Sequence, residues 1–194
     1  MARSKVAIIG NGKVGGALAR GLGRAHEVRA VGNDKAAVRD VASWADAVIL
    51  AVPFGAIGDV VETVGGALDG KIVVDVTNAL DASMSLAVGF TTSGAEELQK
   101  KLPRSHVIKA FNTVFAAYME TGHLGDQALT AFVAGDDAGA RSAVLGLARD
   151  IGFDAVEAGP LKNARTLEPL AHLNIQLGYV LGMGPGIGFK LLHS

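Results

Sequence analysis

Short apolar runs alternate along this chain with stretches in which apolar residues recur at the spacing of one helix face. The first run, residues 5–9, ends in a glycine-rich turn. Val14, Leu18 and Leu22 then follow at helical spacing, and residues 27–31 form a second apolar run that Gly32 ends. This pattern predicts a β-α-β unit at the start of the chain.

The alternation continues almost to the end of the sequence. Further strands are predicted over residues 47–52, 71–76, 106–111, 129–134 and 155–158. Helices are predicted over 93–102, where Ser93 and Glu96 form a capping box, over 137–150, and over about 162–181. Alternating strands and helices predict an α/β fold, a doubly wound, mostly parallel sheet of the Rossmann type with a small C-terminal helical portion. We assign 1–160 to the Rossmann domain and 161–194 to a C-terminal helix and Gly-rich tail packed on it.

One interval is too short for the usual arrangement. About a dozen residues separate the strand that ends near Asn33 from the strand that begins at Ala47. A parallel crossover alone needs about that many residues. The third strand or its preceding helix is therefore expected to be missing or vestigial.

Composition narrows the class of protein. The 194 residues carry a net charge of −1, with no basic stretch to follow a nucleic-acid backbone, and no cysteine. The apolar stretch 167–189 contains polar residues and two prolines, which do not suit a membrane span. No signal-peptide pattern is evident at the N-terminus. We expect a cytoplasmic protein without a nucleic-acid or membrane partner.

The turn after the first strand carries the fingerprint Gly10-Asn11-Gly12-Lys13-Val14-Gly15. Between a buried strand and a helix, this pattern predicts a nicotinamide dinucleotide site. Gly10 is expected to make the tight turn, Gly12 to admit the pyrophosphate, and Gly15 to let helix and strand pack closely. The N–H groups of the helix N-terminus would face the diphosphate.

The residues at the end of the second strand determine whether such a site prefers NAD or NADP. An acidic side chain there binds the ribose of NAD, whereas basic and small polar groups receive the 2′-phosphate of NADP. Asn33 and Lys35 can donate to a phosphate, and Asn11 can reach across from the turn. Asp34 repels a phosphate unless it points away. The residues alone leave this choice open.

Other candidates are weaker. Asn78 and Asn112 each end a strand, where they serve either a ligand or a turn, and His172 either faces the cleft or is packed. Asp136-Asp137 suits a helix cap better than a catalytic pair. The histidines are scattered, so no metal site is predicted; they are residues 26, 106, 123, 172 and 193. Without an evident acid, base or nucleophile, hydride transfer between two bound cofactors fits best, and no catalytic side chain is assigned.

The chain resembles the coenzyme F420-dependent NADP oxidoreductase family almost end to end. Besides the glycine fingerprint, the resemblance rests on Ala51-Val52-Pro53, Asp75-Val76-Thr77-Asn78, Lys109-Ala110-Phe111-Asn112-Thr113-Val114, Ala158-Gly159-Pro160-Leu161-Lys162-Asn163-Ala164-Arg165, Gly182-Met183-Gly184 and Gly188-Phe189-Lys190.

This resemblance implies a Rossmann enzyme that exchanges hydride between NADP(H) and the deazaflavin F420 or a flavin. Asn11, Asn33 and Lys35 would serve the 2′-phosphate, and residues 51–53 would line the dinucleotide path. The nicotinamide would lie at Asn112, Val114 and Ala116, with Ile187 and Gly188 closing over the second ring. The chain departs from the family at Asn33-Asp34, where Ser-Arg is usual, and at Asn112, where the best-known F420 enzymes have His.

Two alternatives compete with this NADP-linked reductase. One is a non-catalytic redox sensor that binds NADP(H). The other is a small-molecule reductase of the imine or pyrroline-5-carboxylate type, whose relatives add a long helical dimer domain, whereas about thirty residues follow the last predicted strand here. The apolar end, residues 177–189, also predicts a homodimer in which the tail helps to form the second-ring site.

Overall fold

A computed structural model describes residues 3–192; His193 lies outside the described residues. It contains a seven-stranded sheet in the order β2-β1-β3-β4-β5-β8-β9. The strands are β1 (Lys5–Ile9), β2 (Glu27–Val31), β3 (Ala47–Leu50), β4 (Ile72–Asp75), β5 (His106–Lys109), β8 (Thr130–Gly135) and β9 (Asp154–Glu157). The first five are parallel to one another, which confirms the Rossmann-type α/β fold.

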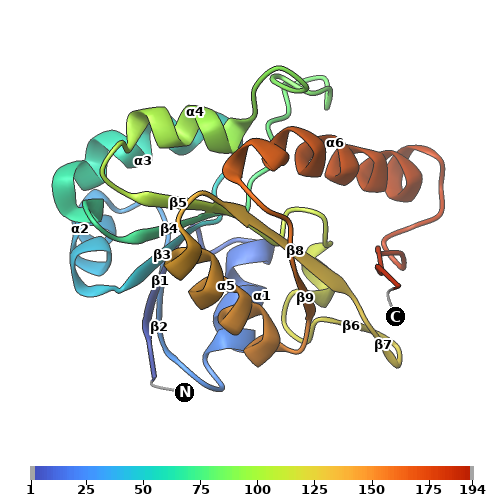
Figure 1. The fold of residues 1–194 in the computed structure, drawn as a ribbon, viewed down its shortest axis with the longest axis horizontal. Helices are drawn as coiled ribbons and strands as arrows, with labels where there is room; N and C mark the ends of the chain where they lie inside the picture. Colours follow the sequence, from blue (N-terminus) through green and yellow to red (C-terminus); the bar gives the residue numbers. More distant parts are fainter. Residues whose placement is uncertain (1–2, 193–194) are drawn as a thin grey trace.

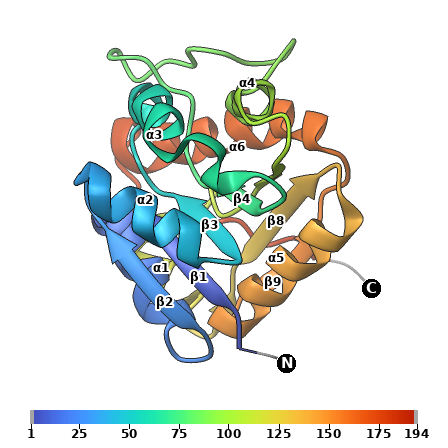
Figure 2. The same ribbon diagram turned by 90° about the vertical axis from the view of Figure 1, so that its left-hand side faces the viewer.

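Helices cover both faces of this sheet (Figures 1 and 2). Residues that alternate along β1 explain this arrangement. Val6 and Ile8 pack in one apolar core with the helices over 13–22 and 138–151, whereas Ala7 and Ile9 pack in a second core with the helices over 35–44, 57–64 and 94–101. The helices are α1 (Lys13–Leu22), α2 (Lys35–Trp44), α3 (Ile57–Val64), α4 (Gly94–Lys101), α5 (Ala138–Ile151) and α6 (Ala164–Ile175). Ser93 caps α4 as predicted, and Asp137 caps α5.

The short interval after β2 is filled by α2 alone. This helix leads directly from β2 to β3, which pairs with β1 on the side away from β2. In residues 3–192 no strand lies outside β2, so the third strand of the usual arrangement is the part that is missing, as the spacing predicted.

Beyond β5 the sheet changes direction. Strand β8 runs antiparallel to β5, and β8, α5 and β9 form the predicted β-α-β passage. Lys109, the last residue of β5, pairs with Ala134, so the first residues of β8 extend past the carboxyl end of β5. A hairpin of β6 (His123–Leu124) and β7 (Gln127–Ala128) precedes β8. The sequence analysis missed it because two-residue strands show no periodicity.

The C-terminal portion folds back toward the sheet. Helix α6 ends at Ile175, and a π-helical turn covers Gln176–Val180, where the sequence analysis predicted continuous helix. The tail then reaches the start of β8, where the Thr130 N–H donates to the Phe189 carbonyl at 3.0 Å. Because β8 starts beyond the carboxyl end of β5, the tail lies on the side of the sheet at which the parallel strands end.

Candidate functional site

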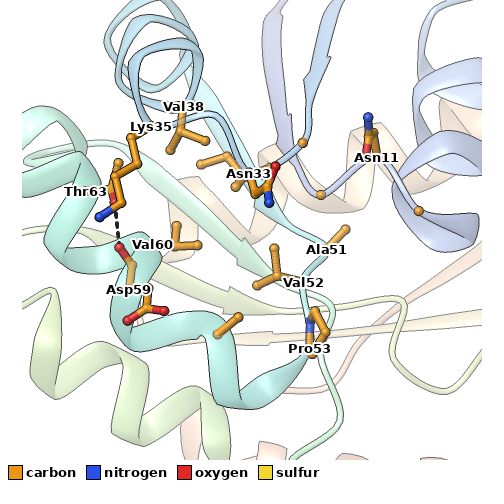
Figure 3. A pocket seen from close by; sticks show the side chains of 15 residues that line it. Asn11, Asn33, Lys35, Val38, Ala51, Val52, Pro53, Asp59, Val60 and Thr63 are labelled. Atoms are coloured by element: carbon orange, nitrogen blue, oxygen red, sulfur yellow. Dashed lines mark hydrogen bonds between the residues drawn. The ribbon is translucent and has the colours of Figure 1, made fainter.

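A cleft of about 650 Å³ opens at the carboxyl ends of β1, β2 and β3, where ligands bind in doubly wound sheets. Figure 3 shows the residues that line it, which come from the glycine turn, the end of β2, α2, the segment after β3 and α3. Eight of the predicted site residues line it, namely Gly10, Asn11, Gly12, Asn33, Lys35, Ala51, Val52 and Pro53. Lys13, Val14 and Asp34 follow these residues in the chain but do not line the cleft itself.

The three fingerprint glycines have different surroundings. A Cβ on Gly10, where φ is +106°, would overlap the Ala51 carbonyl, and a Cβ on Gly15 would overlap the Gly10 carbonyl. Gly15 therefore allows close packing of helix and strand, as predicted, and the positive φ of Gly10 suits the tight turn predicted for it. A Cβ on Gly12 would meet no atom of the described chain within 4 Å. Gly12 thus leaves open space before the first turn of α1, which no side chain caps.

The polar residues around the end of β2 divide into donors that face the cleft and one carboxylate that caps a helix. Asn11 reaches across to Gly32, while Asn33 and Lys35 are exposed on the wall of the cleft (Figure 3). Asp34 is occupied elsewhere, since its carboxylate accepts the Ala37 N–H at 2.8 Å and caps α2. The donors therefore face the cleft, and the acidic side chain serves the helix.

The opposite wall of the cleft comes from α3, which the sequence analysis did not predict. Asp59, Val60 and Thr63 line this wall, and Arg39 of α2 ties the two helices by donating to the Thr63 carbonyl at 2.8 Å. The apolar spacing of Ile57, Val60, Val61 and Val64 was the signal that could have revealed this helix.

Asn78 and Asn112 lie outside that cleft, but the structure brings them together. The Asn78 amide donates to the Asn112 carbonyl, and the Asn112 amide donates to Asn78 Oδ1, both at 3.2 Å. Asn112 also donates to the Leu167 carbonyl of α6 at 2.9 Å. These asparagines follow β4 and β5, the next two strands of the sheet beyond the cleft.

The remaining predicted residues lie in the segment that follows β5 and in the C-terminal tail. Val114 and Ala116 belong to the segment after β5, and Val114 is buried. A Cβ on Gly188 would meet Leu129 at 2.7 Å, while Gly186 lies near the Tyr118 hydroxyl. The tail that carries Ile187 therefore packs on residues that follow β5, and it does not border the glycine cleft.

The sequence analysis missed a buried group of charges behind the asparagines. Lys109 Nζ lies 3.0 Å from Asp75 Oδ2 and 2.9 Å from Glu168 Oε1, and all three side chains are fully buried. Burial lowers the pKa of Lys109, but the two carboxylates raise it by more, so the amine stays protonated. Glu168 also accepts the N–H groups of Gly94 and Ala95 at the N-terminus of α4.

The remaining candidate features contribute little to the site. His172 Nε2 lies 3.1 Å from the Met84 carbonyl, so this histidine holds the loop after β4. Residues 3–192 include no cluster of three or more acidic or histidine side chains suited to a metal ion. Within the same range no helix has the length and apolar character needed to cross a membrane.

Fold and site together define a Rossmann-type protein whose ligand cleft lies at the carboxyl edge of its sheet. The sequence profile described as "NADP oxidoreductase coenzyme F420-dependent" matches residues 30–79. The F420-dependent NADP reductase of Methanocaldococcus jannaschii is 32% identical over 162 residues, which span 80% of this chain and 71% of that protein. The chain belongs to the F420-dependent NADP oxidoreductase family.

Two further similarities extend this finding. A candidate F420-dependent NADP reductase from Arthrobacter sp. FB24, whose crystal structure is known, is 28% identical, with a TM-score of 0.89 over 98% of this chain and 100% of that one. Human metalloreductase STEAP2 is 32% identical over 103 residues, which cover 53% of this chain. That match spans only a fifth of the length of the metalloreductase.

Proposed function

We propose that this protein is an NADP(H)-binding oxidoreductase that transfers hydride between NADP(H) and coenzyme F420 or a flavin. The observation that carries the proposal is the open space before α1 at Gly12, in a cleft at the carboxyl ends of β1, β2 and β3. Asn78 and Asn112 follow β4 and β5, the next two strands of the same sheet. The names of its relatives, an F420-dependent NADP reductase among them, agree with this chemistry.

The residues of the cleft suit the dinucleotide. The uncapped N–H groups at the start of α1 would face the diphosphate, and Gly12 leaves room for it. Residues 51–53 would line the path toward the nicotinamide, whose C4 supplies the hydride when the cofactor is bound. Asn78, Asn112, Val114 and Ala116 would position that ring.

NADP is favoured over NAD. Asn33 and Lys35 face the cleft and can donate to a 2′-phosphate, whereas the Asp34 carboxylate is directed to the N-terminus of α2. Lys35 is the one cationic side chain among the described residues that line the cleft, and Asp59 is the one acidic one. The preference should therefore be modest.

The second ring would bind where the tail meets the segment after β5. Ile187 and Gly188 would close over it. These residues belong to the C-terminal portion, 161–194, which we propose packs on the Rossmann domain of residues 1–160.

The C-terminal portion also exposes apolar side chains that favour a homodimer, in which the partner would cover them. About two thirds of the surface is exposed at Tyr179, Val180, Leu181 and Met183. Light scattering tests this assembly: a mass of about 20 kDa, that of one 19.8 kDa chain, would contradict it.

Rapid mixing tests the reaction itself. The protein loaded with NADPH is mixed with F420, FMN or FAD, and NADPH oxidation is followed by absorbance. We expect at least one acceptor to be reduced. Deletion of the residues after Leu181 should lower the rate of this reduction far more than it lowers the affinity for NADPH. A protein that binds NADPH but reduces none of them would fit a redox sensor. Turnover with a cyclic imine alone would favour the small-molecule reductase.

A further inference from the structure

The buried charges and the two asparagines belong to one closed ring of contacts. Lys109 Nζ donates to the Thr77 carbonyl at 2.6 Å, and the Thr77 N–H donates to Asp75 Oδ1 at 2.8 Å. Thr77 is therefore held from both sides by charged groups, and the next residue in the chain is Asn78.

The ring continues through the asparagines and returns to the lysine. Asn78 pairs with Asn112, and Asn112 donates to the carbonyl of Leu167. Leu167 precedes Glu168, whose carboxylate lies 2.9 Å from Lys109 Nζ. A change at the lysine is thus transmitted to the asparagines both through the end of β4 and through α6.

Two costs are concentrated at this ring. Asn112 is only 5% exposed, and its Oδ1 has no hydrogen-bond partner within residues 3–192; Thr77 Oγ1 lacks one as well. An unpaired buried polar atom costs about 1–3 kcal/mol. Phe111, next to Asn112, has a φ of +64°, a left-handed conformation that bulky residues rarely adopt. Residues with such energetic costs persist only where the surrounding structure fixes them, and they are concentrated at functional sites.

We propose that Lys109, Asp75 and Glu168 are positioning residues that fix the Asn78–Asn112 pair to recognise the carboxamide of the nicotinamide ring. The inference rests on the proposed function and deepens it. The side chains of the charged groups are fully buried, so they would act on a ligand through the asparagines. They hold the backbone on either side of the pair, and the buried Asn112 Oδ1 has no hydrogen-bond partner within residues 3–192. In the proposed complex the carboxamide N–H of the nicotinamide would donate to this acceptor.

The test compares two ligands that differ in the nicotinamide. Calorimetry is performed with NADPH and with 2′,5′-ADP, which keeps the adenosine, its 2′-phosphate and one 5′-phosphate but lacks the nicotinamide, its ribose and the second phosphate of the diphosphate. The main variant, Lys109→Met/Asp75→Asn/Glu168→Gln, removes every charge together, because one partner removed alone leaves a buried charge unpaired. Glu168→Gln alone is the milder second variant, for use if the triple variant does not fold.

We expect the triple variant to keep its 2′,5′-ADP affinity within about twofold and to lose about tenfold in NADPH affinity, or 1.4 kcal/mol. Glu168→Gln should lose about threefold, half of that free energy. Asn112→Ala should lose as much as the triple variant, and the combination should lose less than the sum, since both act through one contact.

The control is His26→Gln/Asp150→Asn, a pair at the opposite edge of the sheet in which His26 is 5% exposed and lies 3.0 Å from Asp150. It should lower the melting temperature without changing the ratio of the two affinities. A folded triple variant, or a folded Glu168→Gln protein, with unchanged NADPH affinity would overturn the proposal and leave the ring a purely structural role. A wild-type protein that binds neither ligand would overturn the proposed function and this proposal with it.

Discussion

The two halves of the candidate site are built in opposite ways. Around Gly12 the cleft is open, and its polar side chains, Asn11, Asn33 and Lys35, are exposed and make few contacts. At Asn78 and Asn112 the edge is closed, and amides, carbonyls and buried charges are joined in one ring. Under the proposed function, the open half would supply binding surface for a flexible, charged ligand. The closed half would supply the fixed geometry that a reacting ring needs.

Breaking the closed half should have the largest effect on stability. Lys109→Met leaves the Asp75 and Glu168 carboxylates buried without their cation, and we expect a loss of about 3–5 kcal/mol in the free energy of unfolding. Urea denaturation measures this loss. The neutral triple variant should recover most of it, and a loss below about 1 kcal/mol for the single variant would show that the carboxylates are not held by the lysine.

Breaking the open half should abolish binding and spare the fold. In Gly12→Val the added side chain enters space that no described atom occupies, but that the diphosphate would need. We expect NADPH affinity to fall at least about 100-fold, or 2.7 kcal/mol, at an unchanged melting temperature. Calorimetry and thermal unfolding measure the two.

Gly15→Val is the matched variant of the same turn. Its Cβ would overlap the Gly10 carbonyl, so it should lower the melting temperature as well. Equal stability losses in the two variants would remove the distinction between the roles of the glycines.

Substitutions at Asp34 test the proposed preference for NADP over NAD. Asp34→Arg should tighten NADPH by about 1.5–3 kcal/mol through a charge-assisted contact with the phosphate. It should also cost about 1 kcal/mol of stability, because the cap of α2 is lost.

Asp34→Ser separates these two effects, since serine keeps a capping oxygen and removes the charge. It should tighten NADPH modestly at little cost in stability. A wild-type preference for NADH, or an Asp34 carboxylate bound to a ribose hydroxyl in a complex, would contradict the assignment.

The smallest expected effect concerns the support of the closed half by α4 and α6. Arg165 donates three hydrogen bonds to the Glu96 carboxylate, which hold the pKa of Glu96 below its usual range, although burial opposes this. Glu96→Gln should cost about 1 kcal/mol at neutral pH. Because the folded pKa is lowered, this difference should be present above about pH 4.3 and be lost as the pH falls through the folded pKa. Denaturation at pH 7 and pH 3 measures it.

The glycine turn of the open half, but not its α3 wall, could be predicted from the sequence because local rules determine the turn. Strand, glycine turn and helix are consecutive, so the positions of Gly10, Gly12 and Gly15 follow from spacing. That either the third strand or its preceding helix is missing followed from chain length alone, and the structure shows that it is the strand.

The closed half could not be predicted in this way. Lys109 and Glu168 are 59 positions apart and meet only because α6 returns across the end of β5. In the sequence, Lys109 is one polar residue in an apolar run, and Glu168 is one polar residue of an amphipathic helix. Residue spacing also left open whether Asn78 and Asn112 bind a ligand or form turns, and gave no sign that they pair.

A crystal structure of the protein with bound NADP⁺ would test most directly whether the two halves form one site. The account predicts that the diphosphate lies against the N–H groups at the start of α1, over Gly12. It also predicts the 2′-phosphate beside Asn33 and Lys35, and the nicotinamide carboxamide at the Asn78–Asn112 pair. A dinucleotide bound elsewhere, or one whose nicotinamide end points away from these asparagines, would contradict it.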